Sequence, residues 1–222
     1  CHIGKLQRYL QCSAGGSDIP MKRAIIILAL LVFPLVSLLA EPISFSGGST
    51  SMHMQQGFET ITLSQGATIT SGSLRLEADT IVLTGESFRY ATCSGSVSLN
   101  DEERGISLHS KNLYYDRQEE LIIIDGYLEL DDQINEVIAS AFHLEFALDD
   151  GVVLLQVQVQ LFKHTDSGAM ACKADSLRFN RESQMLNLEG NAIIDWDKDL
   201  YQAQRITVDL TTEAITMEGA IK

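Results

Sequence analysis

From Ile43 onward, apolar and polar residues alternate with a period of two, and short polar clusters separate the alternating runs. Such alternation is typical of strands that bury one face, and clusters of Asp, Asn, Glu and Gly mark hairpin turns. Proline is absent after Pro42, so no residue removes a hydrogen-bond donor from a sheet. The pattern predicts an all-β domain without helices, whose turns fall at 100–103, 116–119, 149–151, 165–168, 180–183 and 197–199.

A degenerate repeat of about thirty residues underlies these strands, and self-similarity at such a period predicts stacked supersecondary units. Each unit contains one characteristic residue pair, and in most units at least one residue of the pair is small. The pairs are Ala78-Asp79, Ser110-Lys111, Ser140-Ala141, Ala174-Asp175 and Ala203-Gln204. Each unit then returns through a glycine, except the one around Val157, and these glycines are Gly66, Gly95, Gly126, Gly190 and Gly219.

The apolar phase slips by one residue just after the small residue of most units. In the first clear unit, Leu76 and Ala78 share one parity while Ile81 has the other. Because such a slip turns side chains to the other face of a sheet, a bulge or bend must restore them. We therefore expect each repeat to be a strand pair bent across two facing sheets.

Two details refine this expectation. The unit at Ser140 is an exception, because its apolar residues keep one phase as far as Phe146. In the last unit Gly219 shares the apolar phase, so we expect this glycine to face the interior and to leave space for a second bend. Together the units predict an open β-jellyroll of stacked, bent strands that encloses an apolar inner groove.

The N-terminal part of the sequence has a different character. Met21-Lys22-Arg23 opens a basic stub, and residues 24–39 are nearly all apolar before the chain reaches Ala40. This order is typical of a secretory signal peptide, with an uncleaved anchor as the alternative. We expect residues 1–20 to be an unstructured upstream extension, 21–40 a signal peptide cleaved after Ala40, and 41–222 a single exported domain.

The charge balance excludes one class of partner. The whole chain has a net charge of −14, and residues 1–40 hold four basic residues against Asp18, which leaves −17 for residues 41–222. Nucleic-acid phosphates require a basic footprint, so we expect no nucleic-acid partner. Acidity of this kind also keeps a strand-rich protein soluble and its edges unpaired.

Catalytic and metal-binding patterns are weak. Cys93 and Cys172 both fall on the apolar phase, and export permits a disulfide between them, although two buried free thiols fit equally well. No Cys or His spacing indicates zinc, and no nucleophile signature is present. We expect no enzyme activity and no cofactor, because the carboxylates that could serve a glycosidase lie at expected corners and turns: Asp79, Asp131, Asp132, Asp149, Asp150 and Asp175.

The expected inner face is the remaining candidate site. Acyl chains could complete the packing of a groove that is not fully closed, since each buried methylene contributes about 0.8 kcal/mol. The alternative is a structural or adhesive β-solenoid whose filled core takes no ligand. The candidate lining residues are Leu76, Ile81, Leu83, Val97, Leu113, Tyr115, Ile124, Phe142, Leu144, Phe146, Val157, Leu177, Phe179, Leu188, Ile206 and Val208.

Several short motifs recur in order along the chain: Phe45-Ser46-Gly47-Gly48, Leu63-Ser64-Gln65-Gly66-Ala67, Leu76-Glu77-Ala78-Asp79, Leu113-Tyr114-Tyr115-Asp116, Lys173-Ala174-Asp175-Ser176-Leu177 and Leu188-Glu189-Gly190-Asn191-Ala192. With the export signal, they resemble the OstA-like (LptA) family of periplasmic lipopolysaccharide-transport proteins over most of residues 43–222. The resemblance implies an open β-jellyroll with a hydrophobic groove and a non-enzymatic role in outer membrane biogenesis. It also implies that lipopolysaccharide, or another amphiphilic glycolipid, is relayed between the inner and outer membranes.

The expected partners follow from the fold. A stacked sheet without caps exposes edge strands that can pair with another chain. We therefore expect end-to-end association with OstA-like proteins of the inner and outer membranes, and possible head-to-tail association of this chain with itself.

Overall fold

The computed structural model describes residues 43–55 and 58–219, all within one of the two compact units of the chain, 41–222. The expected upstream extension and signal peptide lie outside the described residues. Within them, no helix is long and apolar enough to cross a membrane.

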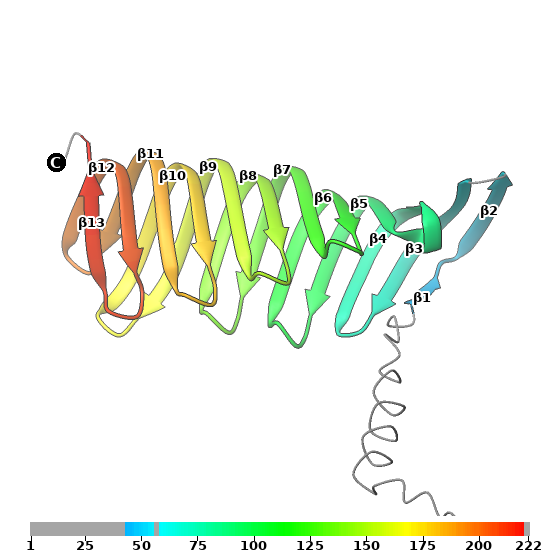
Figure 1. Cartoon of the computed structure of the whole chain (residues 1–222), viewed down its shortest axis with the longest axis horizontal. Helices are drawn as coiled ribbons and strands as arrows, with labels where there is room; N and C mark the ends of the chain where they lie inside the picture. Colours follow the sequence, from blue (N-terminus) through cyan, green and yellow to red (C-terminus); the bar gives the residue numbers. More distant parts are fainter. Residues whose placement is uncertain (1–42, 56–57, 220–222) are drawn as a thin grey trace, which may run out of the picture. The chain divides into compact units, whose positions relative to one another are not determined.

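The described residues form a single antiparallel sheet of 13 strands, in which nearly every strand pairs with its neighbours in sequence (Figure 1). Between β4 and β5 lies a short 3-10 helix, η1 (Glu86–Phe88). The strands are β1 (Ile43–Ser46), β2 (Ser49–Gln55), β3 (Phe58–Ser71), β4 (Leu74–Thr84), β5 (Tyr90–Asp101), β6 (Ile106–Asp116), β7 (Leu121–Asp132), β8 (Val137–Ala147), β9 (Val152–Thr165), β10 (Gly168–Asn180), β11 (Met185–Trp196), β12 (Asp199–Asp209) and β13 (Ala214–Glu218).

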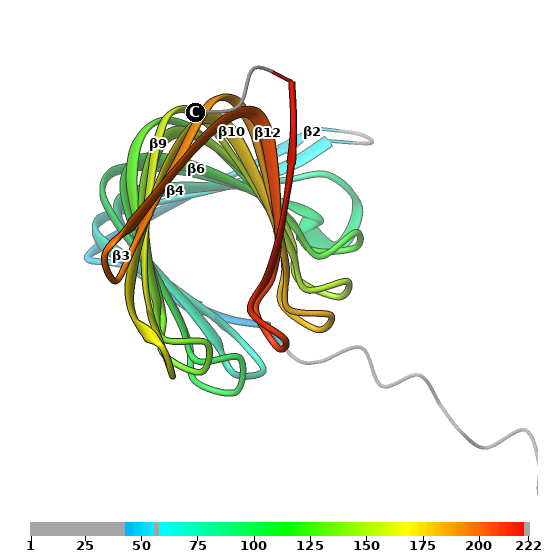
Figure 2. The same ribbon diagram turned by 90° about the vertical axis from the view of Figure 1, so that its left-hand side faces the viewer.

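The prediction of an open, all-β fold of stacked bent strands is confirmed, but the two expected sheets are one. Each long strand bends near its middle, where its pairing register shifts: β4 shifts between Glu77 and Thr80, and β5 between Ser94 and Val97. Viewed along the stack, the bent strands wrap around a common interior (Figure 2). The phase slip in the sequence therefore marks a bulge within one continuous sheet.

The bends of neighbouring strands lie side by side and form a ridge along the stack. Small-residue pairs form the bend of β4, β8, β10 and β12, whereas glycines form the bend of β5, β7 and β11. The expected second bend at the return glycine is thus confirmed for Gly95, Gly126 and Gly190. Gly219, in contrast, is exposed rather than inward-facing. A Cβ on Gly95 would overlap the Asp79 carboxylate, and one on Gly190 would lie 2.5 Å from Asp175 Oδ2. The glycine therefore leaves room for the corner residue of the adjacent strand.

The unit that lacks a glycine bends all the same. Val157 and Gln158 of β9 adopt φ angles of 65° and 56°. A β-branched residue in the left-handed region is a strained outlier. Val157 is also 55% exposed, so its predicted inward position is wrong: at this bend both residues turn to the outside.

The unit at Ser140 is not an exception either. Ala139 and Ala141 are buried before the bend and Leu144 and Phe146 after it, so the phase slips here as in the other units. Phe142 is 43% exposed and its predicted inward position is wrong. Because Phe142 is apolar although it lies on the outer face, it hides the phase slip in the sequence.

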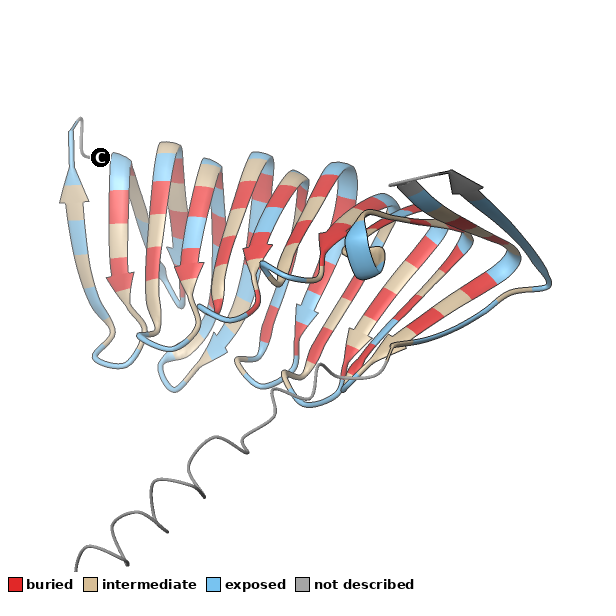
Figure 3. Ribbon diagram, turned by 45° about the vertical axis from the view of Figure 1, so that its right-hand side comes forward, coloured by how far each residue is buried: buried red, intermediate tan, exposed pale blue. Residues whose placement is uncertain are grey.

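The inner face of the bent sheet is a continuous apolar core. Buried side chains from β3 to β12 form one cluster, and buried and exposed residues alternate along each strand (Figure 3). Each predicted turn is confirmed with its bounds displaced by at most two residues, and the observed turns are 102–105, 117–120, 148–151, 166–167, 181–184 and 197–198.

Candidate functional site

Nearly all the predicted groove residues lie on the inner face, on β4 to β8 and on β10 to β12. Apart from Phe142 and Val157, each of the predicted residues is buried. Leu76 and Ile81 lie on either side of the β4 bend, and Leu188 lies just before the β11 bend. The structure thus brings the candidate residues together into one apolar surface that runs along the stack.

Small side chains line this surface at the ridge. Ala67, Ala78, Ala141, Ala174 and Ala192 are all buried next to a bend. Small residues there let the two halves of each strand approach one another inside the fold, whereas larger side chains such as Phe146 and Phe179 lie farther from the bend. In the structure these inner side chains pack against one another, so the groove is filled by the protein's own residues.

Polar groups are excluded from the inner face and gather at the ends of the strands. Among the described residues, the buried polar side chains are Asp101, Asp116 and Asp132, and each ends its strand. A ligand on the inner face would therefore meet no directional partner until it reached the strand ends.

The hairpin turns at the strand ends form two rows. The first row consists of the turns after β3, β5, β7, β9 and β11, and the second of the turns after β4, β6, β8, β10 and β12. Backbone hydrogen bonds join turns within a row, such as Gln133 N to Gly105 O at 2.9 Å in the first and Arg181 N to Gly151 O at 3.0 Å in the second. We call the line where the two rows meet the seam.

Ion pairs of the first row and of the seam involve arginines that the sequence analysis did not single out. Arg104 donates to Asp101 Oδ2 at 2.9 Å and reaches across the seam to Glu120 Oε2 at 2.8 Å. Arg181 donates across the seam to Asp132 at 2.6 and 3.1 Å. The available signal was that each arginine stands within a turn otherwise rich in Asp, Glu and Asn.

Hydrogen bonds lower the pKa of two of the buried carboxyl groups, Asp101 and Asp116. Burial of Asp101 raises its pKa, but hydrogen bonds from the Arg104 backbone, the Ser73 hydroxyl and the Arg104 guanidinium outweigh burial, so the pKa lies below its usual value. The Arg89 guanidinium, 2.6 Å from Asp116, likewise lowers the pKa of that carboxyl. Both groups are charged and paired at neutral pH.

The cysteines and the carboxylates of the ridge have structural roles. Cys93 and Cys172 are buried free thiols, and burial raises the pKa of each to about 12. Asp79 accepts a hydrogen bond from the Ser96 backbone N–H at 3.1 Å, and Asp175 accepts one from Asn191 at 2.8 Å. Within the part of the chain that the structure describes, no cluster of His, Cys, Asp and Glu could hold a metal ion.

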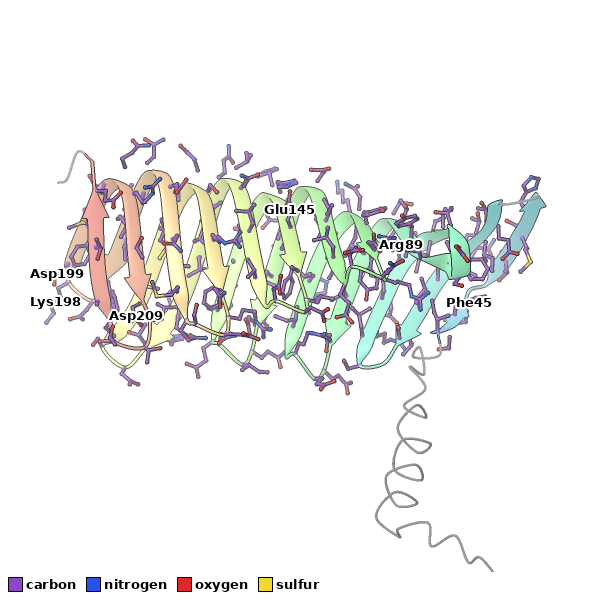
Figure 4. The ribbon with its side chains drawn as sticks, viewed as in Figure 1. Phe45, Arg89, Glu145, Lys198, Asp199 and Asp209 are labelled. Carbon is purple, nitrogen blue, oxygen red and sulfur yellow. The ribbon has the colours of Figure 1, made fainter. Side chains whose placement is uncertain are left out.

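The outer face carries a small exposed aromatic area on β7 and β8. Figure 4 shows the projecting side chains, with Glu145 in the middle of the stack and Asp209 near its β13 end. The rings of Tyr127 and Phe142 pack edge to face with their centroids 5.6 Å apart, and both are exposed. Phe142 thus belongs to an outer aromatic pair and not to the groove.

Comparison with known proteins finds matches among solved structures alone. No family model matches the chain, and no curated protein matches it. Among the matching solved structures is LptH, described as the LptA-homologous periplasmic component of the lipopolysaccharide transport device from Pseudomonas aeruginosa. The match has 12% sequence identity and a TM-score of 0.26, and it covers 81% of this chain and 84% of that one. The function proposed below therefore rests on the inner face of this chain.

Proposed function

We propose that this protein is a periplasmic carrier that binds the acyl chains of an amphiphile against its inner face and relays it from the inner to the outer membrane. Lipopolysaccharide or a similar glycolipid is the proposed cargo. The carrier acts by binding, without catalysis. The acyl chains stay out of water on the inner face while the head group remains solvated at the strand ends.

The observation that carries this proposal is the uninterrupted apolar inner face. From Ile61 in β3 to Val208 in β12, the buried side chains are apolar, and the buried carboxylates stand at the strand ends. Each buried methylene of an acyl chain gains about 0.8 kcal/mol without any directional contact. Such a surface holds a chain firmly and presents no polar group that would fix its position along the stack, which suits a relay.

The sheet edges support end-to-end partners. Among the described strands, β13 pairs only with β12, over Arg205–Asp209, and β1 and β2 pair only with β3. Unpaired strand edges can be extended by a strand from another chain. We propose that proteins of the same fold dock there, and that a second copy of this chain can do the same.

A structural β-solenoid is the competing function, and the packing of the core favours it. The inner side chains fill the interior, and Leu76, Phe146 and Leu188 have no measurable exposure. A solenoid needs only this filled core, whereas a carrier must separate these side chains to admit a ligand. The two functions therefore differ in whether the inner face is ever in contact with lipid.

Site-specific photo-crosslinking distinguishes them. A diazirine-bearing phenylalanine analogue is placed at Phe179 on the inner face and, as a matched control, at Phe142 on the outer face. The full chain is then illuminated with lipopolysaccharide. The carrier predicts a crosslink at position 179 and none at 142. Crosslinks at neither position, or only at 142, would leave the solenoid as the better account.

A further inference from the structure

The inner face is separated from solvent at the seam by side chains alone. The sheet order runs from β1 to β13 without returning on itself, so among the described strands no backbone ladder joins the two rows of turns. The contacts that cross the seam connect residues 16 to 49 positions apart in sequence and lie between β5 and β13. Closure of the groove therefore depends on these side chains.

Arg181 makes the central contact of the seam. From the turn after β10 its Nε donates to Asp132 Oδ2 at 2.6 Å, and its Nη2 donates to Asp132 Oδ1 at 3.1 Å and to Arg104 O at 2.7 Å. The side chains of Arg181 and Asp132 are only 11% and 2% exposed. A two-point Arg–carboxylate pair of this kind is among the strongest polar contacts in proteins.

The same guanidinium lies above the apolar core. Its Cζ is 6.0 Å from the centre of the Phe146 ring, and Phe146 is fully buried. Arg181 thus stands between solvent and the inner face at the middle of the stack. Any acyl chain that reached Phe146 from the side would have to displace this side chain.

Further polar contacts extend the seam in both directions. Gln184 Nε2 donates to Asn135 Oδ1 at 2.6 Å, next to the Arg181 contact. Arg104 pairs with Glu120 toward the β5 end, and Ser167 donates to Glu213 toward the β13 end. These side chains can replace their hydrogen bonds to one another with hydrogen bonds to water. The strands behind them are instead joined continuously by backbone hydrogen bonds.

The geometry points to a lateral gate. We propose that the seam is the opening through which acyl chains reach the inner face, and that Arg181 with Asp132 is its latch. When the gate opens, the two rows of turns move apart, and each row stays joined by its own hydrogen bonds. The ridge serves as the hinge. This inference rests on the proposed function and adds the route by which the groove is loaded.

A removable bridge across the seam tests the gate. Asn135 and Gln184 are replaced by cysteine in the full chain, with Cys1 and Cys12 replaced by serine, and joined by a short bis-methanethiosulfonate reagent. Cys93 and Cys172 are 1% exposed and so are shielded from the reagent. Uptake of cis-parinaric acid, a fluorescent fatty acid, is followed by stopped flow before and after reduction of the bridge.

The matched control bridges two turns of the same row. Asp150→Cys and Glu182→Cys are both exposed, belong to adjacent turns of the second row and take the same reagent. The gate predicts that the bridge across the seam slows uptake at least about tenfold, a barrier of about 1.4 kcal/mol, and that reduction restores it. The bridge within the row leaves uptake unchanged.

Two other outcomes are distinct from one another. If the bridged protein takes up the fatty acid as fast as its reduced form, the gate is wrong while the carrier survives. If the reduced protein and the unmodified chain both fail to bind the fatty acid, the carrier and the gate are both wrong.

Opening the latch provides the opposite test. Arg181→Gln removes the charged contact, and the gate predicts uptake several-fold faster than in the unmodified chain, with Arg181→Lys in between. Arg178→Gln makes the same charge change at an exposed position of β10 and should leave uptake unchanged. Initial rates are measured below the unfolding transition of each variant. Equal rates in Arg181→Gln and Arg178→Gln would overturn the role of the latch.

Discussion

The ridge and the seam close the same interior in different ways. Along the ridge, the backbone of each strand continues through its bend. The glycine of one bend leaves room for the corner aspartate of the neighbouring strand, as Gly95 does for Asp79. Along the seam, the two rows of turns meet through side chains such as Arg181 and Asp132. The ridge is thus part of the fold, whereas the seam is a set of contacts that can separate without any strand pairing being lost.

Changes at the ridge and changes at the seam should therefore affect different properties of the protein. A change at the ridge strains the backbone of the native state and should mainly lower the free energy of unfolding. A change at the seam should lower it too, because buried charges lose partners, but should also alter ligand uptake.

At the ridge, Gly95→Ala should be severely destabilising, by about 3 kcal/mol, because its Cβ would overlap Asp79 at a φ of 102°. Gly126→Ala is the matched comparison. Its φ is 120°, but Asn112 Nδ2 is 3.7 Å away, so only backbone strain of about 1–2 kcal/mol remains. Urea unfolding measures both. Equal losses would mean that the contact with Asp79 does not shape the bend.

At the seam, Asp132→Asn should cost about 3 kcal/mol, because it leaves the buried Arg181 guanidinium without its carboxylate. Asp131→Asn, one residue away on the exposed side, should stay within about 0.5 kcal/mol of the unmodified chain. Chemical unfolding provides the free energies, and fatty-acid uptake is measured on the same samples. A stable Asp132→Asn variant with unchanged uptake would contradict the latch.

At the bend without a glycine, Val157→Gly should stabilise the protein by about 1 kcal/mol. Glycine adopts the φ of 65° without strain, and the exposed Val157 side chain contributes little packing. Val159→Gly, two residues further along and buried, should instead be destabilising. Thermal unfolding compares the two, and a loss of stability in Val157→Gly would show that this bend is not strained.

The smallest effect concerns pH. The folded-state pKa of Asp101 is lowered, so its stabilising contribution is complete above its unfolded-state pKa of about 3.9 and is lost as pH falls through the folded value. Stability should therefore decline on acidification below about pH 4, and Asp101→Asn should flatten that decline. Unfolding midpoints measured across acidic pH test this, with Asp131→Asn as the exposed control.

The sequence predicted the ridge well because the bend is a local feature. Ala78-Asp79 with Gly95, and Ala174-Asp175 with Gly190, locate bends that the register shifts confirm. The alternation fails at positions where the character of a side chain does not match the face on which it lies. Phe142 is apolar yet lies on the outer face, and the strained Val157 takes the place that a glycine fills elsewhere.

The seam could not be predicted from the pattern of strands. Arg181 and Asp132 are 49 residues apart and lie in different rows of turns. They meet because of the curvature of the whole sheet, which alternation does not determine. Alternation identifies the inward side chains, but not how closely the two rows approach or which charges meet there.

Native mass spectrometry with lipid extraction shows whether the protein carries lipid. The protein is purified from cells that produce the full chain, in gentle buffers and without detergent, and then mixed with lipopolysaccharide. The account predicts a bound amphiphile with acyl chains, either retained from the cell or acquired on mixing. A protein that carries no lipid and ignores added lipopolysaccharide would contradict the carrier and favour a structural solenoid with a permanently filled core.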